Sequence, residues 1–220
     1  MDIIENIDNI RSNIPDNVKI IAVSKTKPIE DMQIVYNYGI KDFGENKVQE
    51  LLKKYDCLPK DVRWHLLGHL QRNKVKYIVG KVDLIQSLDS IRLLDEIEKE
   101  FSKQGIIANA LIQINIGRES QKYGILEEEL ETLLINIEKC SNVKIHGIMA
   151  IIPRNGETKN SFYFKRLYEI WNKLKLKQFK NISMDVLSMG MTHDYEDAIK
   201  EGSNMVRIGE GIFGKREYNL

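Results

Sequence analysis

The chain has 220 residues, of which 42% are hydrophobic and 30% are charged. This length is sufficient for one substantial core, and parallel α/β barrels of this size form a single domain. Its 33 Lys and Arg residues against 32 Asp and Glu residues give a formal net charge of +1. The chain as a whole therefore has no strong electrostatic attraction for nucleic acid or for an anionic membrane, and we expect one domain over 1–220.

Cysteine usage and the N-terminal segment indicate the cellular compartment. Cys57 and Cys140 are far apart and have no metal-ligand spacing, so neither a disulfide framework nor a zinc site is predicted. Residues 1–15 are acidic and amphipathic, unlike a secretory signal, and no apolar run approaches the roughly 18 residues that span a bilayer. We therefore expect a cytoplasmic protein with no membrane contact.

Apolar, β-branched runs alternate along the chain with longer segments whose apolar residues recur every three or four positions. The predicted strands cover 18–25, 41–46, 63–70, 82–89, 107–116, 143–152, 184–191 and 205–213. Crossover helices are predicted within 28–39, 90–105, 125–140 and 161–179. Pro28 suits the first turn of a helix, Ser90 is a helix N-cap, and Gly39 and Gly105 stand where glycine ends a helix.

Eight strand–helix repeats that close on themselves predict a (β/α)8 TIM barrel, here with an extra N-terminal helix. An open, doubly wound sheet is the alternative. No GxGxxG motif follows the first strand and no P-loop sequence occurs, which disfavours the nucleotide-binding forms of that alternative.

In a barrel of this type the ligand site lies at the carboxyl ends of the strands. The polar residues that close the predicted strands are Lys25, Glu45, Asn46, His69, Ser87, Asp89, Asn115, Ser188, Arg207 and Gly209.

Lys25 is the strongest candidate for chemistry. Period-two alternation puts Ile21, Val23 and Lys25 on one face of the first strand. A lysine directed into a pocket of low dielectric is a competent amine nucleophile toward a carbonyl group. The alternative is a lysine that reaches solvent at the strand end. We expect Lys27, just before a proline, to point to solvent.

Two glycine-rich loops follow the last two strands, within 187–199 and 206–214. Loops at these positions commonly form the phosphate site of a barrel, because glycine lets backbone N–H groups approach an anion. Ser188 and Thr192 can add hydroxyl donors. The alternative is that both loops are simple turns.

A nucleophilic lysine beside a phosphate site points to a phosphorylated aldehyde, either pyridoxal 5'-phosphate (PLP) or the substrate of a phosphosugar aldolase. Arg207 would then have a specific role, since a guanidinium beside the pyridine nitrogen keeps that nitrogen unprotonated. The alternative for Arg207 is an ordinary salt bridge.

Other polar residues carry weaker predictions. His65 and His69 lie too far apart along a strand to share a metal. We expect His146 to be a core residue and His193 to belong to a helix start. The basic segment 71–81 is interpreted as a solvated helix face, with a nucleic-acid contact as the alternative.

Several long motifs resemble a known family. They read IIAVSKTKP, FGENKVQE, WHLLGHLQRNK, IQSLDS, GIMAI and LSMGMTHDYEDAIKEGSNMVRIGEGIFG. Together they cover nearly the whole chain and are similar to the pyridoxal-phosphate homeostasis protein family, which resembles the N-terminal barrel of alanine racemase.

The resemblance implies a single barrel that holds PLP as an internal aldimine on Lys25. It implies phosphate contacts from Ser188 and from the backbone around Gly209 and Glu210, of which Glu210 contributes only its N–H. Arg207 would face the pyridine nitrogen and Asn46 would lie near the ring. At the end of the third strand, His69 is also assigned to the cofactor site.

The family is regarded as a carrier or regulator of the cellular PLP pool, without robust catalysis. Racemases need a second base from a further domain, and this chain ends at Tyr218, Asn219 and Leu220, soon after the eighth strand, so we do not expect two-base racemisation. We expect a monomer that passes PLP to apo-enzymes. A PLP-dependent amino-acid racemase and a cofactor-free Schiff-base aldolase are the alternative functions.

Overall fold

The computed structural model describes residues 2–153 and 159–215, so the chain end at 218–220 lies outside the described residues. The strands are β1 (Lys19–Val23), β2 (Asp42–Glu45), β3 (Arg63–Leu66), β4 (Leu84–Leu88), β5 (Ala108–Gln113), β6 (Val143–Met149), β7 (Ile182–Met191) and β8 (Met205–Ile208). The α-helices are α1 (Ile3–Arg11), α2 (Ile29–Asn37), α3 (Val48–Tyr55), α4 (Ile91–Ser102), α5 (Leu130–Ile137), α6 (Asn160–Lys175), α7 (Tyr195–Lys200) and α8 (Glu210–Phe213). Two 3-10 helices are η1 (Arg72–Tyr77) and η2 (Glu127–Glu129).

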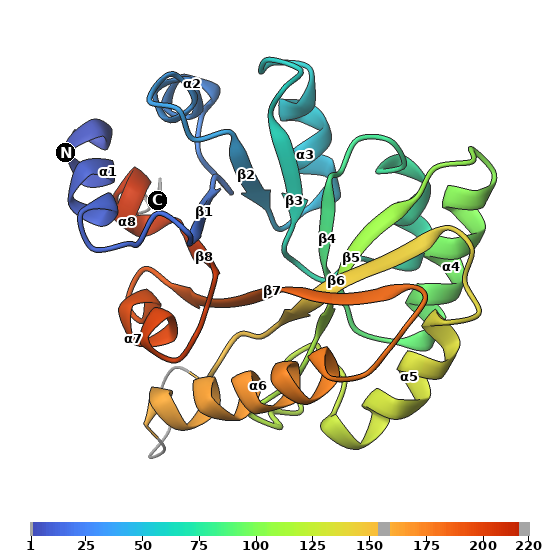
Figure 1. Cartoon of the computed structure of the whole chain (residues 1–220). Helices are drawn as coiled ribbons and strands as arrows, with labels where there is room; N and C mark the ends of the chain where they lie inside the picture. Colours follow the sequence, from blue (N-terminus) through green and yellow to red (C-terminus); the bar gives the residue numbers. More distant parts are fainter. Residues whose placement is uncertain (1, 154–158, 216–220) are drawn as a thin grey trace.

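The strands form a closed parallel barrel in chain order. Closure comes from β1, which pairs with β2 on one side and with β8 on the other, where Ile21 is the partner of Arg207. Figure 1 shows the helices arranged around the outside of the strands. The predicted TIM barrel is confirmed, and the open doubly wound sheet is wrong.

The alternation of side chains along the strands divides the core into two layers. A small cluster of buried apolar residues in the barrel comprises Ile21, Leu84, Leu111, Met149 and Met205. A much larger apolar cluster includes the buried residues of the helices and their partners on the strands. The strands are therefore covered on both faces, which is why they read as nearly continuous apolar runs.

Helix α4 illustrates how local sequence defines an element. Ser90 is its N-cap, and the Ser90 hydroxyl accepts a hydrogen bond from the N–H of Leu93 at 3.3 Å. Gly105 follows the helix with φ of +64°, a conformation that suits glycine. The helix buries one apolar face, made of Leu93, Leu94, Ile97 and Phe101.

Several boundaries differ from the prediction. The segment 205–213, predicted as one strand, is a strand only as far as Ile208 and continues as helix α8. Pro28 is the N-cap of α2 and not part of its first turn. The basic segment after β3 forms only the short helix η1, in which Lys74 and Lys76 lie over the ring of Tyr77. Strand β3 ends at Leu66, because the following chain turns at Gly68, where a Cβ would lie 2.3 Å from the carbonyl oxygen of Asn46. His69 is therefore a loop residue.

The extra N-terminal helix is present and packs against the last helix (Figure 1). The Asn6 side chain donates a hydrogen bond to the carbonyl of Ile212 at 3.0 Å. Ile7 and Ile10 are buried in the main core. Helix α1 thereby supports α8, which follows β8 directly.

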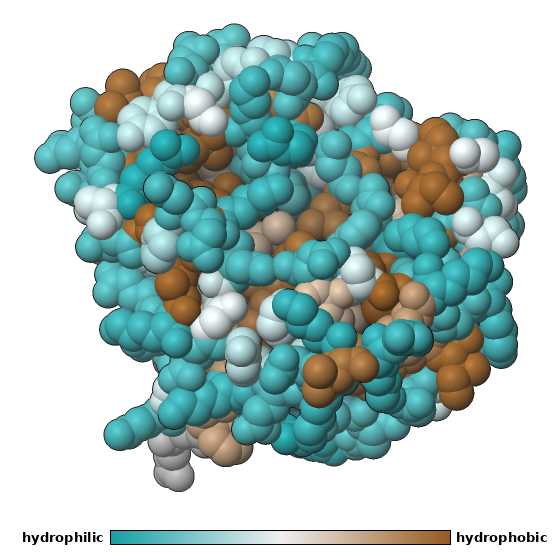
Figure 2. All heavy atoms as spheres, viewed as in Figure 1, coloured by the Kyte–Doolittle hydropathy of each residue, from teal (hydrophilic) through white to brown (hydrophobic). Residues whose placement is uncertain are grey.

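The surface is mainly hydrophilic on the face shown in Figure 2, with hydrophobic residues in small separate patches and around a central hollow. Among the helices that the structure describes, none is long and apolar enough to cross a membrane.

Candidate functional site

A cavity of about 950 Å³ opens at the carboxyl ends of the barrel strands. Of the residues predicted for the site, Lys25, Asn46, His69, Arg207, Gly209 and Glu210 line it. Lys27, Tyr123, Thr192 and His193 also line it. Ser188, which the resemblance assigns to the phosphate, does not line this cavity.

Lys25 stands two residues beyond the end of β1, half-buried in the cavity wall. The next residue, Thr26, has φ of +65°, which is uncommon for a residue other than glycine. Strained backbone of this kind persists only where the surroundings hold it. The segment that presents Lys25 is therefore fixed by its neighbours.

A buried charged network behind β1 provides this support. The ammonium of Lys54 lies 2.8 Å from the carbonyl of Ser24, from Glu45 Oε1 and from Glu50 Oε1. The Ser24 hydroxyl donates to Glu45 Oε1 at 2.6 Å. Glu50 also accepts a hydrogen bond from the N–H of Thr26. Both neighbours of Lys25 are thus tied to the same lysine and carboxylates.

Glu45 belongs to this buried network and not to the cavity wall. Its side chain is fully buried between β1, β2 and α3, and it does not line the cavity, although it closes a predicted strand. Burial raises the pKa of Glu45 above its usual value, against the hydrogen bonds from Lys54 and Ser24. Burial also acts on Glu50, but its bonds to Lys54 and Thr26 outweigh burial and lower its pKa.

Arg207 is a buried cation at the base of the cavity. Its Nη1 donates to Ser188 Oγ at 2.6 Å and its Nη2 donates to the carbonyl of Ala150 at 2.8 Å. Both acceptors are neutral. Burial lowers the pKa of Arg207 to about 10, so the guanidinium stays protonated at neutral pH. These bonds use two of its five N–H groups, and the others can serve an acceptor in the cavity.

Ser188 lies beneath Arg207 in the barrel interior and is completely buried. Its hydroxyl accepts from Arg207 and donates to Gln86 Oε1 at 2.7 Å. The direct phosphate contact expected of Ser188 stays a prediction, and its position favours a role in holding Arg207.

The hydroxyl of Thr192 contacts the glycine-rich segment that follows β8. Its Oγ1 accepts a hydrogen bond from the N–H of Gly211 at 3.1 Å, which joins the loop after β7 to the first turn of α8. A Cβ on Gly211 would lie 3.0 to 3.1 Å from Ile208, Ile10 and Thr192. The close packing shows why glycine stands there.

His69 and Asn46 stand on another part of the cavity wall. His69 Nδ1 lies 2.7 Å from Asp89 Oδ2, and its ring stacks on Tyr123 with centroids 3.8 Å apart and planes 8° apart. Asp89 is nearly buried, whereas Tyr123 is 57% exposed. The carboxylate and the aromatic ring together fix the orientation of this imidazole.

The charged side chains of Glu210 and Lys27, both at the cavity rim, point in different directions. The Glu210 side chain is 44% exposed and lies 3.8 Å from His193 Nε2, so it faces the opening. The expectation that Lys27 points to solvent is wrong. Its ammonium donates to the carbonyls of Phe213 and Gly214 at 2.9 and 3.3 Å, which ties the end of α8 to the cavity rim.

Sequence reasoning missed Tyr123 and Gln86. Tyr123 belongs to a loop after β5 with no strand-end signal. Gln86 had a usable signal, because period-two alternation puts it on the same face of β4 as Leu84, which lies in the barrel interior. Asn115 and Ser87, also strand-end candidates, lie outside the cavity lining.

Among the residues that the structure describes, no group of three or more His, Cys, Asp or Glu side chains could hold a metal ion. His146 contacts Asn109 at 2.8 Å, and burial lowers its pKa.

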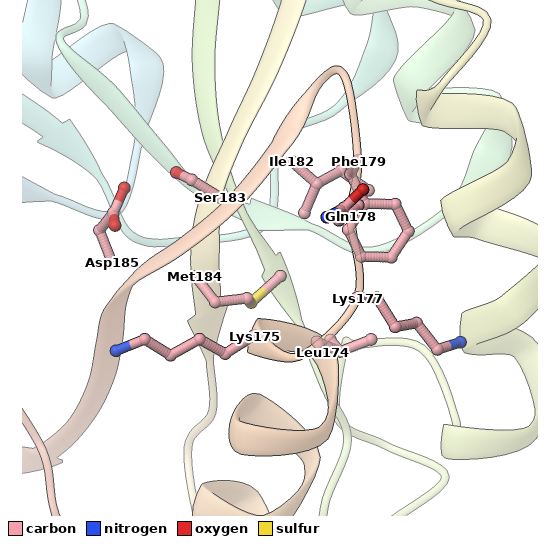
Figure 3. A pocket seen from close by; sticks show the side chains of 9 residues that line it. All are labelled: Leu174, Lys175, Lys177, Gln178, Phe179, Ile182, Ser183, Met184 and Asp185. Atoms are coloured by element: carbon pink, nitrogen blue, oxygen red, sulfur yellow. The ribbon is translucent and has the colours of Figure 1, made fainter.

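A second hollow of about 480 Å³ lies between the end of α6 and the start of β7 (Figure 3). The side chains of Lys175 and Lys177 point away from each other there. Lys175 lies over the ring of Trp171, and Lys177 pairs with Glu131. This hollow gathers no convergent polar groups.

Comparison with known proteins places the chain in a family. The alanine racemase N-terminal domain family matches residues 2–217. The pyridoxal phosphate homeostasis protein of Aquifex aeolicus is 45% identical over 203 residues, which cover 91% of this chain and 88% of that protein. The protein of the same name from Haemophilus influenzae is 39% identical over 208 residues, with 93% and 87% coverage.

Solved structures agree. PipY of Synechococcus elongatus without PLP has a TM-score of 0.90 and 32% identity, and PipY with PLP bound has 0.88 and 31%. Both alignments cover 97% of this chain and 100% of PipY. Alanine racemase of Clostridium difficile, at 15% identity and a TM-score of 0.78, shares the fold, and this chain spans 56% of its length. The chain therefore belongs to the pyridoxal phosphate homeostasis proteins, within the alanine racemase N-terminal domain family.

Proposed function

We propose that this chain binds PLP through Lys25 and takes part in PLP homeostasis in the cell. One observation carries the proposal: a single cavity brings together Lys25, the buried cation Arg207 and the glycine loop joined to Thr192. The names of the relatives and the PLP-bound structure of PipY support it. When bound, PLP supplies an aldehyde that condenses with amines and a ring that accepts electrons.

Each residue has a distinct task. The Lys25 amine holds the aldehyde carbon, and an Arg207 N–H donates to the ring nitrogen. Thr192 and the backbone N–H groups of Gly209 and Glu210 bind the phosphate, because N–H and O–H donors on a loop can surround an anion. Asn46 and His69 line the cavity beside the ring, His69 held by its bond to Asp89.

The charge on Arg207 supports a carrier and not a robust enzyme. The Arg207 guanidinium, whose partners are neutral, donates hydrogen bonds but does not transfer a proton. A ring nitrogen that faces it therefore stays unprotonated. An unprotonated ring withdraws electrons less strongly from a bound amine. Arg207 therefore favours holding the cofactor over turning substrate over.

One observation favours a second candidate, weak amino-acid racemisation. The His69–Asp89 pair is a possible proton carrier in the same cavity as Lys25. Incubation of the PLP-loaded protein with L-alanine, followed by chiral analysis, tests it. A rate of D-alanine formation no higher than that of free PLP excludes this activity.

For the physiological role, we propose that the protein acts as a cytoplasmic monomer and that PLP-dependent apo-enzymes receive its cofactor. The test compares reactivation of an apo-enzyme in the same compartment as the loaded protein with reactivation across a dialysis membrane. Faster reactivation in direct contact supports transfer between the two proteins. Equal rates indicate release into solution.

The binding proposal is tested by absorption spectroscopy with PLP. We expect a visible band that sodium borohydride removes while leaving the cofactor on the peptide that contains Lys25. The matched variants are Lys25→Ala and Lys27→Ala, because both lysines line the cavity. Loss of covalent cofactor in Lys25→Ala alone supports the proposal, and retention of it in Lys25→Ala refutes the proposal.

A further inference from the structure

A continuous row of buried polar side chains crosses the barrel interior from the cavity to the opposite end. Its members, in order, are Arg207 on β8, Ser188 on β7, Gln86 on β4, His65 on β3 and Asp42 on β2. None of the five is more than 5% exposed. A row of this kind in the core of a barrel is costly unless every member is hydrogen-bonded.

Each member contacts the next within hydrogen-bond distance. Arg207 Nη1 lies 2.6 Å from Ser188 Oγ, and Ser188 Oγ lies 2.7 Å from Gln86 Oε1. Gln86 Nε2 lies 3.1 Å from His65 Nδ1. His65 Nε2 lies 3.0 Å from Asp42 Oδ1. The contact between Ser188 and Gln86 spans the barrel, because β7 and β4 are not neighbours in the sheet.

The two ends of the row lie in different environments. Arg207 lines the cavity, at the carboxyl ends of the strands. Asp42 is the first residue of β2 and so lies at the opposite end. There it accepts from Arg63 Nε at 2.9 Å and lies 3.8 Å from the Lys19 ammonium. Arg63 and Lys19 are about half exposed, at 47% and 49%.

The chemistry of the end groups assigns a direction to every bond. A guanidinium only donates, so Ser188 accepts from Arg207 and gives its own proton to Gln86 Oε1. The amide NH2 of Gln86 then donates to His65 Nδ1. His65 must therefore carry its proton on Nε2, which donates to the carboxylate of Asp42.

Two further observations agree with this direction. The Gln86 Nε2 atom also lies 3.2 Å from the sulfur of Met205, a weak acceptor that suits an NH2 group and not a carbonyl oxygen. Burial by itself would raise the pKa of Asp42, but the hydrogen bonds from His65 and Arg63 outweigh it and hold that pKa well below its usual range. Asp42 is thus a permanent acceptor.

We propose that Gln86, His65 and Asp42 are positioning residues for the cofactor site: they hold Ser188, and through it the guanidinium of Arg207, in the orientation that meets the ligand. The proposal rests on the proposed PLP function. If the Gln86 amide were rotated so that Oε1 and Nε2 exchanged places, Ser188 would face two donors, Arg207 and Gln86. Its own proton would then have no acceptor. The row therefore has one fully bonded arrangement, and an aspartate at the far end of the barrel helps to maintain it.

The first test needs no cofactor. In the apo protein with 15N-labelled histidine, we expect His65 to be neutral, with a protonated Nε2 and an unprotonated Nδ1. A protonated Nδ1, alone or in an imidazolium, would overturn the proposal.

The variant Gln86→Glu gives a signature that a merely structural polar core would not. A carboxylate at this position can accept from both Ser188 and His65, so His65 must donate from both ring nitrogens. We expect a doubly protonated His65 in this variant near neutral pH, with bonding of Arg207 retained. A His65 that stays neutral would contradict the proposed row.

The second test measures PLP binding. Gln86→Leu leaves the Ser188 proton without an acceptor, and we expect PLP affinity to fall by about tenfold, the usual effect of one unpaired buried donor. Asp42→Asn should give a smaller loss together with a mixture of His65 tautomers. The matched control is Asn109→Leu, which removes a half-buried polar pair with His146 that is separate from the row.

The outcomes distinguish this proposal from the function on which it rests. Wild-type protein that binds PLP, with Gln86→Leu binding it equally well, would overturn the positioning role and leave the function intact. Wild-type protein that binds no PLP would overturn the function, while the His65 measurement would still decide the direction of the row. If Gln86→Leu does not fold, Asp42→Asn provides the comparison of PLP affinity, and Gln86→Glu still tests the direction of the row through the protonation of His65.

Discussion

Replacement of Lys54 by methionine tests how the segment that presents Lys25 is held. Lys54 is 9% exposed and bonds at 2.8 Å to Ser24, Glu45 and Glu50. Its loss leaves the fully buried Glu45 carboxylate with only the Ser24 hydroxyl, and Glu45 Oε2 already has no hydrogen-bond partner. Breaking a buried ion pair by removing one member costs about 3–5 kcal/mol. Against a typical stability of about 5–15 kcal/mol, Lys54→Met removes a large part of the total.

The pH dependence follows from the sign of the pKa shift of Glu45. Burial raises this pKa, so the charged carboxylate disfavours folding increasingly as the pH rises above the unfolded value of about 4.3. Loss of Lys54 raises the pKa further. The deficit in the free energy of unfolding should therefore be larger near neutral pH than near about pH 5. Adding Glu45→Gln to Lys54→Met removes the uncompensated charge and should restore much of the loss.

The assay is urea unfolding followed by tryptophan fluorescence at both pH values. The matched control is Lys60→Met, whose pair with Asp56 has the same 2.8 Å distance but is 71% and 79% exposed. We expect little change in the control. A loss of less than about 1 kcal/mol in Lys54→Met, the range of exposed pairs, would refute the reasoning.

Further predictions concern thiols, the phosphate and a glycine of β7. Cys57 is exposed, whereas burial raises the pKa of Cys140 to about 11, so iodoacetamide should alkylate Cys57 quickly and Cys140 only after unfolding; equal rates would contradict this. Thr192→Val should weaken binding of PLP about tenfold but leave binding of pyridoxal, which lacks the phosphate, unchanged, whereas Ser188→Ala should weaken both. Gly190 has φ of +95° and a Cβ there would lie 2.7 Å from a side-chain carbon of α7, so Gly190→Ala should lower the unfolding midpoint in urea by an amount equivalent to about 2 kcal/mol or more.

Local sequence patterns predicted most of the architecture. Strand and helix periods alternate, which indicates right-handed parallel connections and favours a closed barrel, whereas the pairing of β1 with β8 in the structure excludes the open sheet. The same alternation put Lys25 on one face of β1 with Ile21, and the structure shows that Ile21 lies inside the barrel. The glycine loop at Gly209 was found for a similar reason, because its position after the last strand determines which end of the barrel it joins.

These local patterns could not predict contacts between distant strands. Periodicity gives the face of Gln86 and of Ser188, but the two side chains meet only because the barrel closes and brings β4 opposite β7. Two further contacts depend likewise on which elements pack together. Lys54 supports the segment of Lys25, and Lys27 donates a hydrogen bond to the end of α8. The sequence by itself determined the alternation of strands and helices, the candidate lysine and the glycine-rich segments after the last two strands. Only the tertiary structure decided which groups hold them in place, because a hydrogen bond across a closed barrel depends on curvature and register that no local pattern encodes.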